Sequence, residues 1–138
     1  MNRQCITTAV WIFIGTLCIT PVSLAKEYIS HVQADIVFDK ETYKLGEKIE
    51  GQVHVYSTAP ATVTMSFQLR MYLNGELEHQ TITEIKNVFT GENEYPLEVF
   101  GIPETFAKRS SVGQWRMTIG ELGLDNNVLA EIFFKIVK

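Results

Sequence analysis

The chain has 138 residues, of which 12 are Lys or Arg and 16 are Asp or Glu, and its formal net charge at pH 7 is -4. This length favours one compact domain over a repeat array or a two-domain enzyme, and the acidic balance leaves no basic patch with which to bind a nucleic acid backbone. Apolar residues make up 46% of the chain, which is enough for the hydrophobic core of a folded domain.

Residues 1–25 have the three parts of a secretory signal peptide. Arg3 lies in a short N-terminal region, an apolar run of about 15 residues follows, and small residues precede the end at Ala25. The apolar run is shorter than the roughly 20 residues of a membrane-spanning helix, which argues against an uncleaved anchor. We therefore predict cleavage after Ala25 and a mature domain of residues 26–138 that is periplasmic or secreted, with no integral membrane segment after cleavage.

Both cysteines of the chain, Cys5 and Cys18, belong to this expected signal. The mature chain would therefore have no disulfide, no thiolate metal ligand and no cysteine nucleophile. Its folding has to rest on a hydrophobic core, which a domain of this size can supply without cross-links.

In the mature chain, turn residues recur at short intervals, and apolar and polar residues alternate between them, as in β-strands with one buried face. The expected strands are approximately residues 29–38, 49–56, 63–73, 76–89, 95–100, 114–119 and 128–137. The third is the clearest, and Asn74-Gly75 after it is typical of a tight hairpin. The polar return strand is expected at a sheet edge. About seven short strands predict an all-β fold, a β-sandwich of two packed sheets.

The segment Phe38–Ile49 contains an Asp-Lys-x-x-Tyr-x-x-Gly-Glu turn. It resembles the opening of many immunoglobulin-like modules, including the macroglobulin-type domains, and Val112–Trp115 looks like the Gly-x-Trp start of a late strand in them. Residues 46–53 also resemble the first strands of arrestin-type sandwiches. Both resemblances imply a β-sandwich, the first of them an immunoglobulin-like one, and neither supplies a catalytic residue.

Three residues of the turn have expected structural roles. Tyr43 can lay its ring over the end of the sandwich, and Gly46 can take a backbone angle that is closed to other residues. Glu47 can accept backbone hydrogen bonds at the turn.

The residue types that usually form catalytic or metal sites lack the further residues that would complete such a site. His31, His54 and His79 are far apart in sequence, so a metal site would need them to converge across strands. The methionines share the phase of buried positions, no serine lies in a Gly-x-Ser-x-Gly elbow, and no glycine-rich phosphate loop is present. We therefore expect a protein that is not an enzyme and has no cofactor, catalytic residue or metal ligand.

Two surfaces are candidates for binding. Tyr56, Gln68, Arg70 and Tyr72 fall on the polar faces of neighbouring strands, and Tyr with Arg is the composition of binding hot spots and of sugar-stacking platforms. Aromatic cross-strand pairs on an ordinary sheet surface are the alternative interpretation. The loop 120–127 offers two carboxylates and two amides to Ca²⁺ or to a partner, although a turn of this composition needs no ligand.

The hypothesis that follows is an exported, non-catalytic binding module that acts by macromolecular surface recognition, as an accessory, inhibitor or assembly protein. Its partner is expected to be another protein. The alternatives are a carbohydrate-binding module, in which exposed tyrosines would share one plane, and a small periplasmic metal carrier or enzyme.

Overall fold

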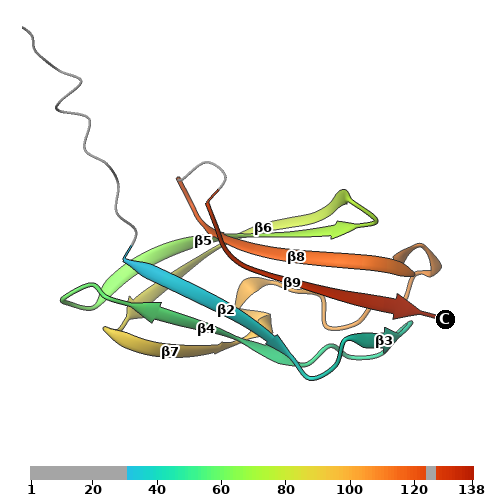
Figure 1. Cartoon of the computed structure of the whole chain (residues 1–138), viewed down its shortest axis with the longest axis horizontal. Helices are drawn as coiled ribbons and strands as arrows, with labels where there is room; N and C mark the ends of the chain where they lie inside the picture. The colour runs from blue at the N-terminus through green and yellow to red at the C-terminus, as the bar shows by residue number, and fades with distance from the viewer. Residues whose placement is uncertain (1–30, 124–126) are drawn as a thin grey trace, which may run out of the picture. The chain divides into compact units, whose positions relative to one another are not determined.

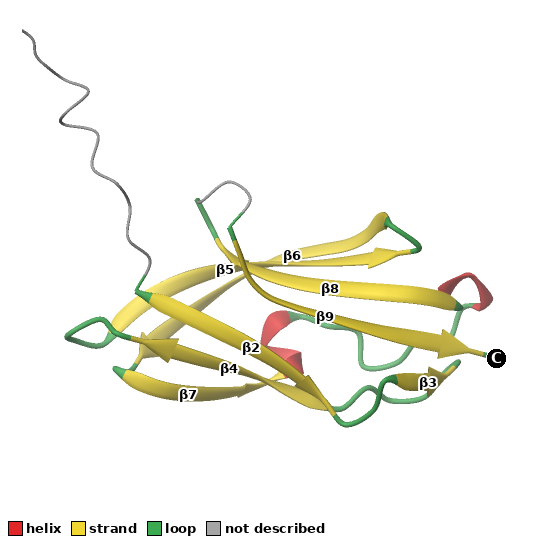
Figure 2. Cartoon of the chain, in the orientation of Figure 1, coloured by secondary structure: helices red, strands yellow, loops and turns green. Residues whose placement is uncertain are grey.

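The computed structural model of the protein describes residues 31–123 and 127–138 (Figures 1 and 2). Its strands are β2 (Val32–Phe38), β3 (Thr42–Lys44), β4 (Gly51–Ser57), β5 (Val63–Leu73), β6 (Glu76–Val88), β7 (Gly91–Pro96), β8 (Gly113–Glu121) and β9 (Val128–Val137). Two 3-10 helices accompany them, η1 (Leu97–Phe100) and η2 (Arg109–Ser111). The expected signal peptide and its cleavage site lie outside the described residues.

The described strands form two sheets that pack as a sandwich, visible as separate layers in Figure 1. One sheet has the strand order β2-β4-β7 and the other the order β3-β9-β8-β5-β6. All pairs are antiparallel except the short parallel pair of β3 with β9. This is the immunoglobulin arrangement, in which β2, β4 and β7 correspond to strands A, B and E and face β9, β8 and β5, which correspond to G, F and C, while β3 and β6 extend the second sheet at its two edges. The all-β, immunoglobulin-like β-sandwich is confirmed, and the macroglobulin type within that class stays a prediction.

The core lies between the inner faces of the two sheets, where the alternating residues of the sequence converge. On β5, Phe67, Leu69 and Met71 are buried, and they face the buried Val53 and Val55 of β4. The expected inward faces of β8 and β9 are buried or half-buried in the same way. Met71 and Met117 are fully buried cross-strand partners, as their phase in the sequence predicted.

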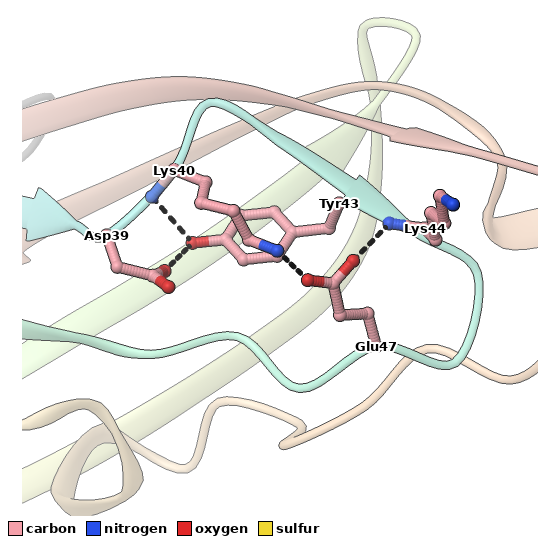
Figure 3. Close-up of polar contacts among 5 residues, drawn as sticks. All are labelled: Asp39, Lys40, Tyr43, Lys44 and Glu47. Atoms are coloured by element: carbon pink, nitrogen blue, oxygen red, sulfur yellow. Dashed lines mark hydrogen bonds and ion pairs between the residues drawn. The ribbon is translucent and has the colours of Figure 1, made fainter.

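The turn between β2 and β4 is organised around Tyr43, which is buried (Figure 3). Its hydroxyl donates a hydrogen bond to Asp39 Oδ1 at 2.5 Å and accepts one from the backbone N–H of Lys40 at 3.4 Å. Burial, followed by the hydrogen bond to Asp39, raises the pKa of Tyr43 above its ordinary value. The ring makes edge contacts with Phe38 and Phe134, so it closes one end of the core as expected.

The two other residues singled out in this turn also take their expected roles. Gly46 has φ of +85°, in the left-handed region that favours glycine. Glu47 accepts a hydrogen bond from the backbone N–H of Lys44 at 2.8 Å and forms an ion pair with Lys40 (Figure 3). Within the turn, Thr42–Lys44 pair with β9 as β3, a strand that the sequence pattern did not predict because three residues are too few to show alternation.

The segment 90–100 differs from its expected structure. A strand was expected at 95–100 with a break after residue 89, whereas the strand β7 begins at Gly91 and η1 follows Pro96. Asn93 is buried inside the strand, and its side-chain amide exchanges hydrogen bonds with the backbone of Phe89. Proline lacks the N–H that a continuing strand would need, and η1 instead directs Phe100 into the core.

The β5–β6 hairpin and the edge position of β6 are confirmed. Asn74 and Gly75 have φ of +50° and +91°, the positive values of a two-residue hairpin turn. β6 pairs with β5 on one side only and is the last strand of its sheet.

Candidate binding surface

The structure separates the four residues expected to form one binding surface. Gln68, Arg70 and Tyr72 lie on β5 and point away from the core, on the outer face of the five-stranded sheet. Tyr56 lies on β4, on the outer face of the three-stranded sheet. The expectation that Tyr56 joins the other three is therefore wrong. The chain crosses from one sheet to the other between β4 and β5, and alternation along a strand does not reveal that crossing.

The outer face of the five-stranded sheet, called the β5 face below, is ordered by the strand register into cross-strand rows. Residues directly opposite each other on adjacent strands project to the same side of a sheet and interact there. From β6 through β5 and β8 to β9, the rows are Leu77, Tyr72, Arg116 and Phe133; Gln80, Arg70, Thr118 and Glu131; and Ile82, Gln68, Gly120 and Val128.

Arg116 is the central side chain of the first row. Its guanidinium carbon lies 4.2 Å from the centroid of the Tyr72 ring, within the range of a cation–π contact. Its Nη1 donates a hydrogen bond to Glu131 Oε2 at 2.8 Å, which is also an ion pair. Two contacts from different strands therefore hold an arginine and a tyrosine in place on a half-exposed surface, so little conformational entropy remains to be lost on binding.

The second row is held in the same way. Arg70 Nε donates a hydrogen bond to Gln80 Oε1 at 3.0 Å across the β5–β6 pair. Between Arg70 and Glu131 in the row lies Thr118, which is buried although it is on the outer side of the sheet. The long side chains around it cover it, so the middle of the β5 face is a packed layer.

Apolar side chains border this polar centre. Phe133 is 61% exposed, and Ile82 and Val128 are exposed by more than half. Beside Phe133, a hollow of about 260 Å³ opens over β3, β8 and β9, lined also by Thr42 and Lys135. An exposed phenylalanine thus lies next to an anchored arginine and a hollow, and aromatic residues and arginine are the residue types enriched at protein interfaces.

Arg116 and Phe133 were not singled out from the sequence. The sequence does indicate an outward position for Arg116. Trp115, Met117 and Ile119 are apolar at every second position, so Arg116 between them lies on the outer side of β8. Phe133 likewise occupies an outward position of β9, between Glu131 and Lys135. A phenylalanine at an outward position of a strand indicates a candidate binding surface. Only the register of β5, β8 and β9 shows that Phe133 lies in one row with Arg116 and Tyr72.

The opposite outer face, on the three-stranded sheet, has a different character. Tyr56 is 49% exposed and lines a hollow of about 230 Å³ with Asp35, His54 and Glu92. His54 Nε2 lies 3.4 Å from Glu94 Oε2. The strands β2, β4 and β7 contain three carboxylates and neither Lys nor Arg, so Tyr56 lies in an acidic setting.

Each of the three histidines has a separate neighbour. His31 Nδ1 lies 3.4 Å from Thr58 Oγ1, His54 is paired with Glu94, and His79 Nε2 lies 3.2 Å from the carbonyl oxygen of Gly101. Across residues 31–123 and 127–138, no group of three or more His, Cys, Asp or Glu side chains could hold a metal ion. Part of the candidate loop 120–127 lies outside these ranges. No helix in the described part of the chain is long and apolar enough to cross a membrane.

No protein-family model matches the chain, and no curated protein matches it in sequence. Similar solved structures include a Pseudomonas fluorescens alkylpurine DNA glycosylase bound to DNA containing an abasic site analog, with 13% identity and a TM-score of 0.57, over 79% of this chain and 31% of that one. A Paenibacillus cycloisomaltooligosaccharide glucanotransferase complexed with cycloisomaltoheptaose has 15% identity and a TM-score of 0.50, over 76% of this chain and 14% of that one. The CARDB domain of a Pyrococcus furiosus protein in complex with di-metal ions has 20% identity and a TM-score of 0.47, over 77% of this chain and 92% of that one.

The chain thus spans less than a third of the glycosylase and of the glucanotransferase. At these identities the similarity is one of fold alone, and one fold serves many unrelated functions.

Proposed function

We propose that the protein is an exported, non-catalytic binding module that recognises another protein through its β5 face. The observation that carries the proposal is the row of Tyr72, Arg116 and the exposed Phe133, in which Arg116 is held by the Tyr72 ring and by Glu131 of the next row. Tyr and Arg dominate the hot spots of protein interfaces, and an anchored side chain loses less freedom on binding than a mobile one.

The mixed character of this face supports a protein as the partner. Its centre has two arginines and a carboxylate with defined hydrogen bonds, and its border has Ile82, Val128 and Phe133. Protein interfaces combine such apolar contacts with a modest number of polar ones. Export rests on the tripartite pattern of residues 1–25, as set out from the sequence.

The carbohydrate-binding alternative depended on exposed tyrosines that share one plane. Tyr56 and Tyr72 lie on different sheets, and the Tyr72 ring is in contact with Arg116. No observation on the described residues favours that alternative over protein recognition.

Substitutions on the two outer faces test the proposal. The wild-type protein, immobilised, is used to recover its partner from extracts of its own compartment, and the recovery is repeated with Phe133→Ala and Arg116→Ala. Tyr56→Ala is the matched control, because it also removes an exposed aromatic ring but from the opposite sheet. Each β5-face variant should lower recovery at least about tenfold, as expected for hot-spot residues, with folding unchanged. Loss of recovery with Tyr56→Ala alone would contradict the proposal.

A further inference from the structure

The β6 strand is the longest open sheet edge in the described part of the chain. It has 13 residues, Glu76–Val88, and pairs only with β5. The other edges are less accessible or less suitable: β3 has three residues, β2 contacts β9, and β7 ends at Pro96. An open edge offers unpaired N–H and C=O groups to another strand.

The geometry of β6 limits where a second strand could pair. Its register with β5 shifts at both ends: Met71 pairs with His79 but Tyr72 with Leu77, and Met65 pairs with Ile85 but Val63 with Val88. Between these bulges runs a regular stretch of seven residues, His79–Ile85, whose middle residue is Ile82. Ile82 is 55% exposed on the outer side of the sheet.

The inner side of β6 is already occupied within the chain. η1 packs against it, His79 Nε2 lies 3.2 Å from the carbonyl oxygen of Gly101, and Thr81 lies next to Gly101. The backbone edge and the outer side chains therefore remain for a partner. No backbone hydrogen bond other than those to β5 involves β6 in the described residues.

We propose that the β6 edge pairs with the β6 edge of a second copy of this chain, antiparallel and centred on Ile82. In this register the two Ile82 side chains meet at the two-fold axis and Gln80 lies opposite Glu84 within the regular stretch, while Glu78 and Lys86, which flank that stretch, come opposite each other at its two ends. By symmetry each of the polar pairs occurs twice, as in every isologous interface. Opposite charges across strands stabilise pairing and like charges oppose it.

The charges disfavour two alternative pairings of this edge. A two-fold axis one residue earlier, at Thr81, would place Glu78 opposite Glu84. Parallel pairing in register would place each of Glu78, Glu84 and Lys86 opposite itself. The same charged side chains that protect the edge from indiscriminate pairing are thus complementary in one antiparallel arrangement.

The dimer would extend the β5 face. A two-fold axis perpendicular to the sheet keeps the outer faces of both copies on one side, so the two five-stranded sheets become continuous. Two copies of the Tyr72–Arg116 pair would then lie on one surface, and a partner with repeated sites would bind both.

The oligomeric state tests the proposal. Sedimentation equilibrium of the full chain, as its host processes it, is measured from about 1 μM to about 1 mM, the range of Kd for interfaces of modest area. Wild type should pass from monomer to dimer, and Ile82→Lys should stay monomeric. Val128→Lys is the matched control, because Val128 is similarly exposed on the same face but on β9, away from the edge. A wild type that stays monomeric, or a dimer that Ile82→Lys leaves intact, would overturn the proposal.

A charge exchange tests the register itself. Glu78→Lys should abolish the dimer, since it places two positive charges opposite each other, and the double variant Glu78→Lys with Lys86→Glu should restore it. Failure of the double variant to restore dimerisation would overturn the proposed register.

A disulfide supplies an independent readout. In a chain with Cys5→Ala and Cys18→Ala, Ile82→Cys should form a covalent dimer on mild oxidation, because opposite Cα atoms in an antiparallel pair lie about 4.5–5.5 Å apart, within the span of a disulfide. Gln80→Cys should not, since its symmetry mate lies roughly 13 Å away along the strands. Equal cross-linking at both positions would contradict a fixed register.

Discussion

Removing the Tyr43 hydroxyl tests the polar contacts at the centre of the β2–β4 turn. Tyr43→Phe keeps the buried ring, its edge contacts with Phe38 and Phe134 and the Lys40 side chain over its face. It deletes the hydrogen bond that the hydroxyl donates to Asp39 at 2.5 Å and the longer one, of 3.4 Å, that it accepts from the backbone N–H of Lys40. The variant therefore measures these polar contacts without opening a cavity.

The expected loss of stability follows from the charge and the exposure of Asp39, the hydrogen-bond acceptor. A hydrogen bond to a charged group contributes about 1.5–3 kcal/mol to stability. The Asp39 residue is exposed, so water can replace the hydroxyl at the carboxylate, and the lower half of that range applies. We expect Tyr43→Phe to lower the free energy of unfolding by about 1.5–2 kcal/mol.

Urea unfolding at pH 7 of wild type, Tyr43→Phe, Asp39→Ala and the double variant measures this value and its origin. If the hydroxyl acts through Asp39, the sum of the stability losses in the two single variants should exceed the stability loss in the double variant by about 1 kcal/mol. A loss below about 0.5 kcal/mol for Tyr43→Phe, or additive losses, would refute the reasoning.

The same hydroxyl predicts a pH dependence. Because burial and the hydrogen bond to Asp39 raise the pKa of Tyr43 in the folded protein, the native state keeps this proton at a pH where the unfolded chain has lost it. The stabilisation is fully present below the ordinary tyrosine pKa of about 10 and is lost as the pH rises from there through the folded value. The stability difference between wild type and Tyr43→Phe should therefore shrink above about pH 10. A stability difference between the two proteins that grows above this pH would contradict the prediction.

Three further predictions concern the core, a close backbone contact and export. Phe67→Ala should lower the free energy of unfolding by about 3–5 kcal/mol and Gln68→Ala by at most about 0.5, measured by urea unfolding; equal effects would mean that the faces of β5 are misassigned. Gly51→Ala should destabilise the protein, because a Cβ there would overlap the carbonyl oxygen of Val37, and an unchanged thermal midpoint would show that β2 can move away. Mass spectrometry of the protein from its native host should find Lys26 as the first residue, and an intact N-terminus would reject the cleavage site.

Alternation along single strands predicted which side chains are buried. In β5 and β9, the apolar phase of the sequence faces the core and the polar phase faces outward, because the side-chain period of two is a local property of extended backbone. The Asn74-Gly75 hairpin and the Tyr43 turn were likewise predictable, since their conformations follow from the residues at those positions.

The order of strands within each sheet depends on contacts that are distant in sequence, and alternation along single strands does not reveal it. Tyr56 and Tyr72 have the same local pattern, yet the crossing after β4 puts them on opposite faces of the sandwich. Arg116 and Phe133 become one site with Tyr72 only through the register of β5, β8 and β9. Of the four expected site residues, the three on β5 share the proposed surface for the simple reason that one strand carries them.

Site-specific photo-cross-linking in living cells tests the central claim, recognition through the β5 face, most directly. A photoreactive phenylalanine analogue is placed at Phe133 or, as the control, at Tyr56, and the products are separated by mass after irradiation. The account predicts a discrete product from position 133 whose mass differs from that of two joined copies of this chain, weakened when Arg116→Glu is added, and none from position 56. A product from position 56 with none from position 133 would contradict it.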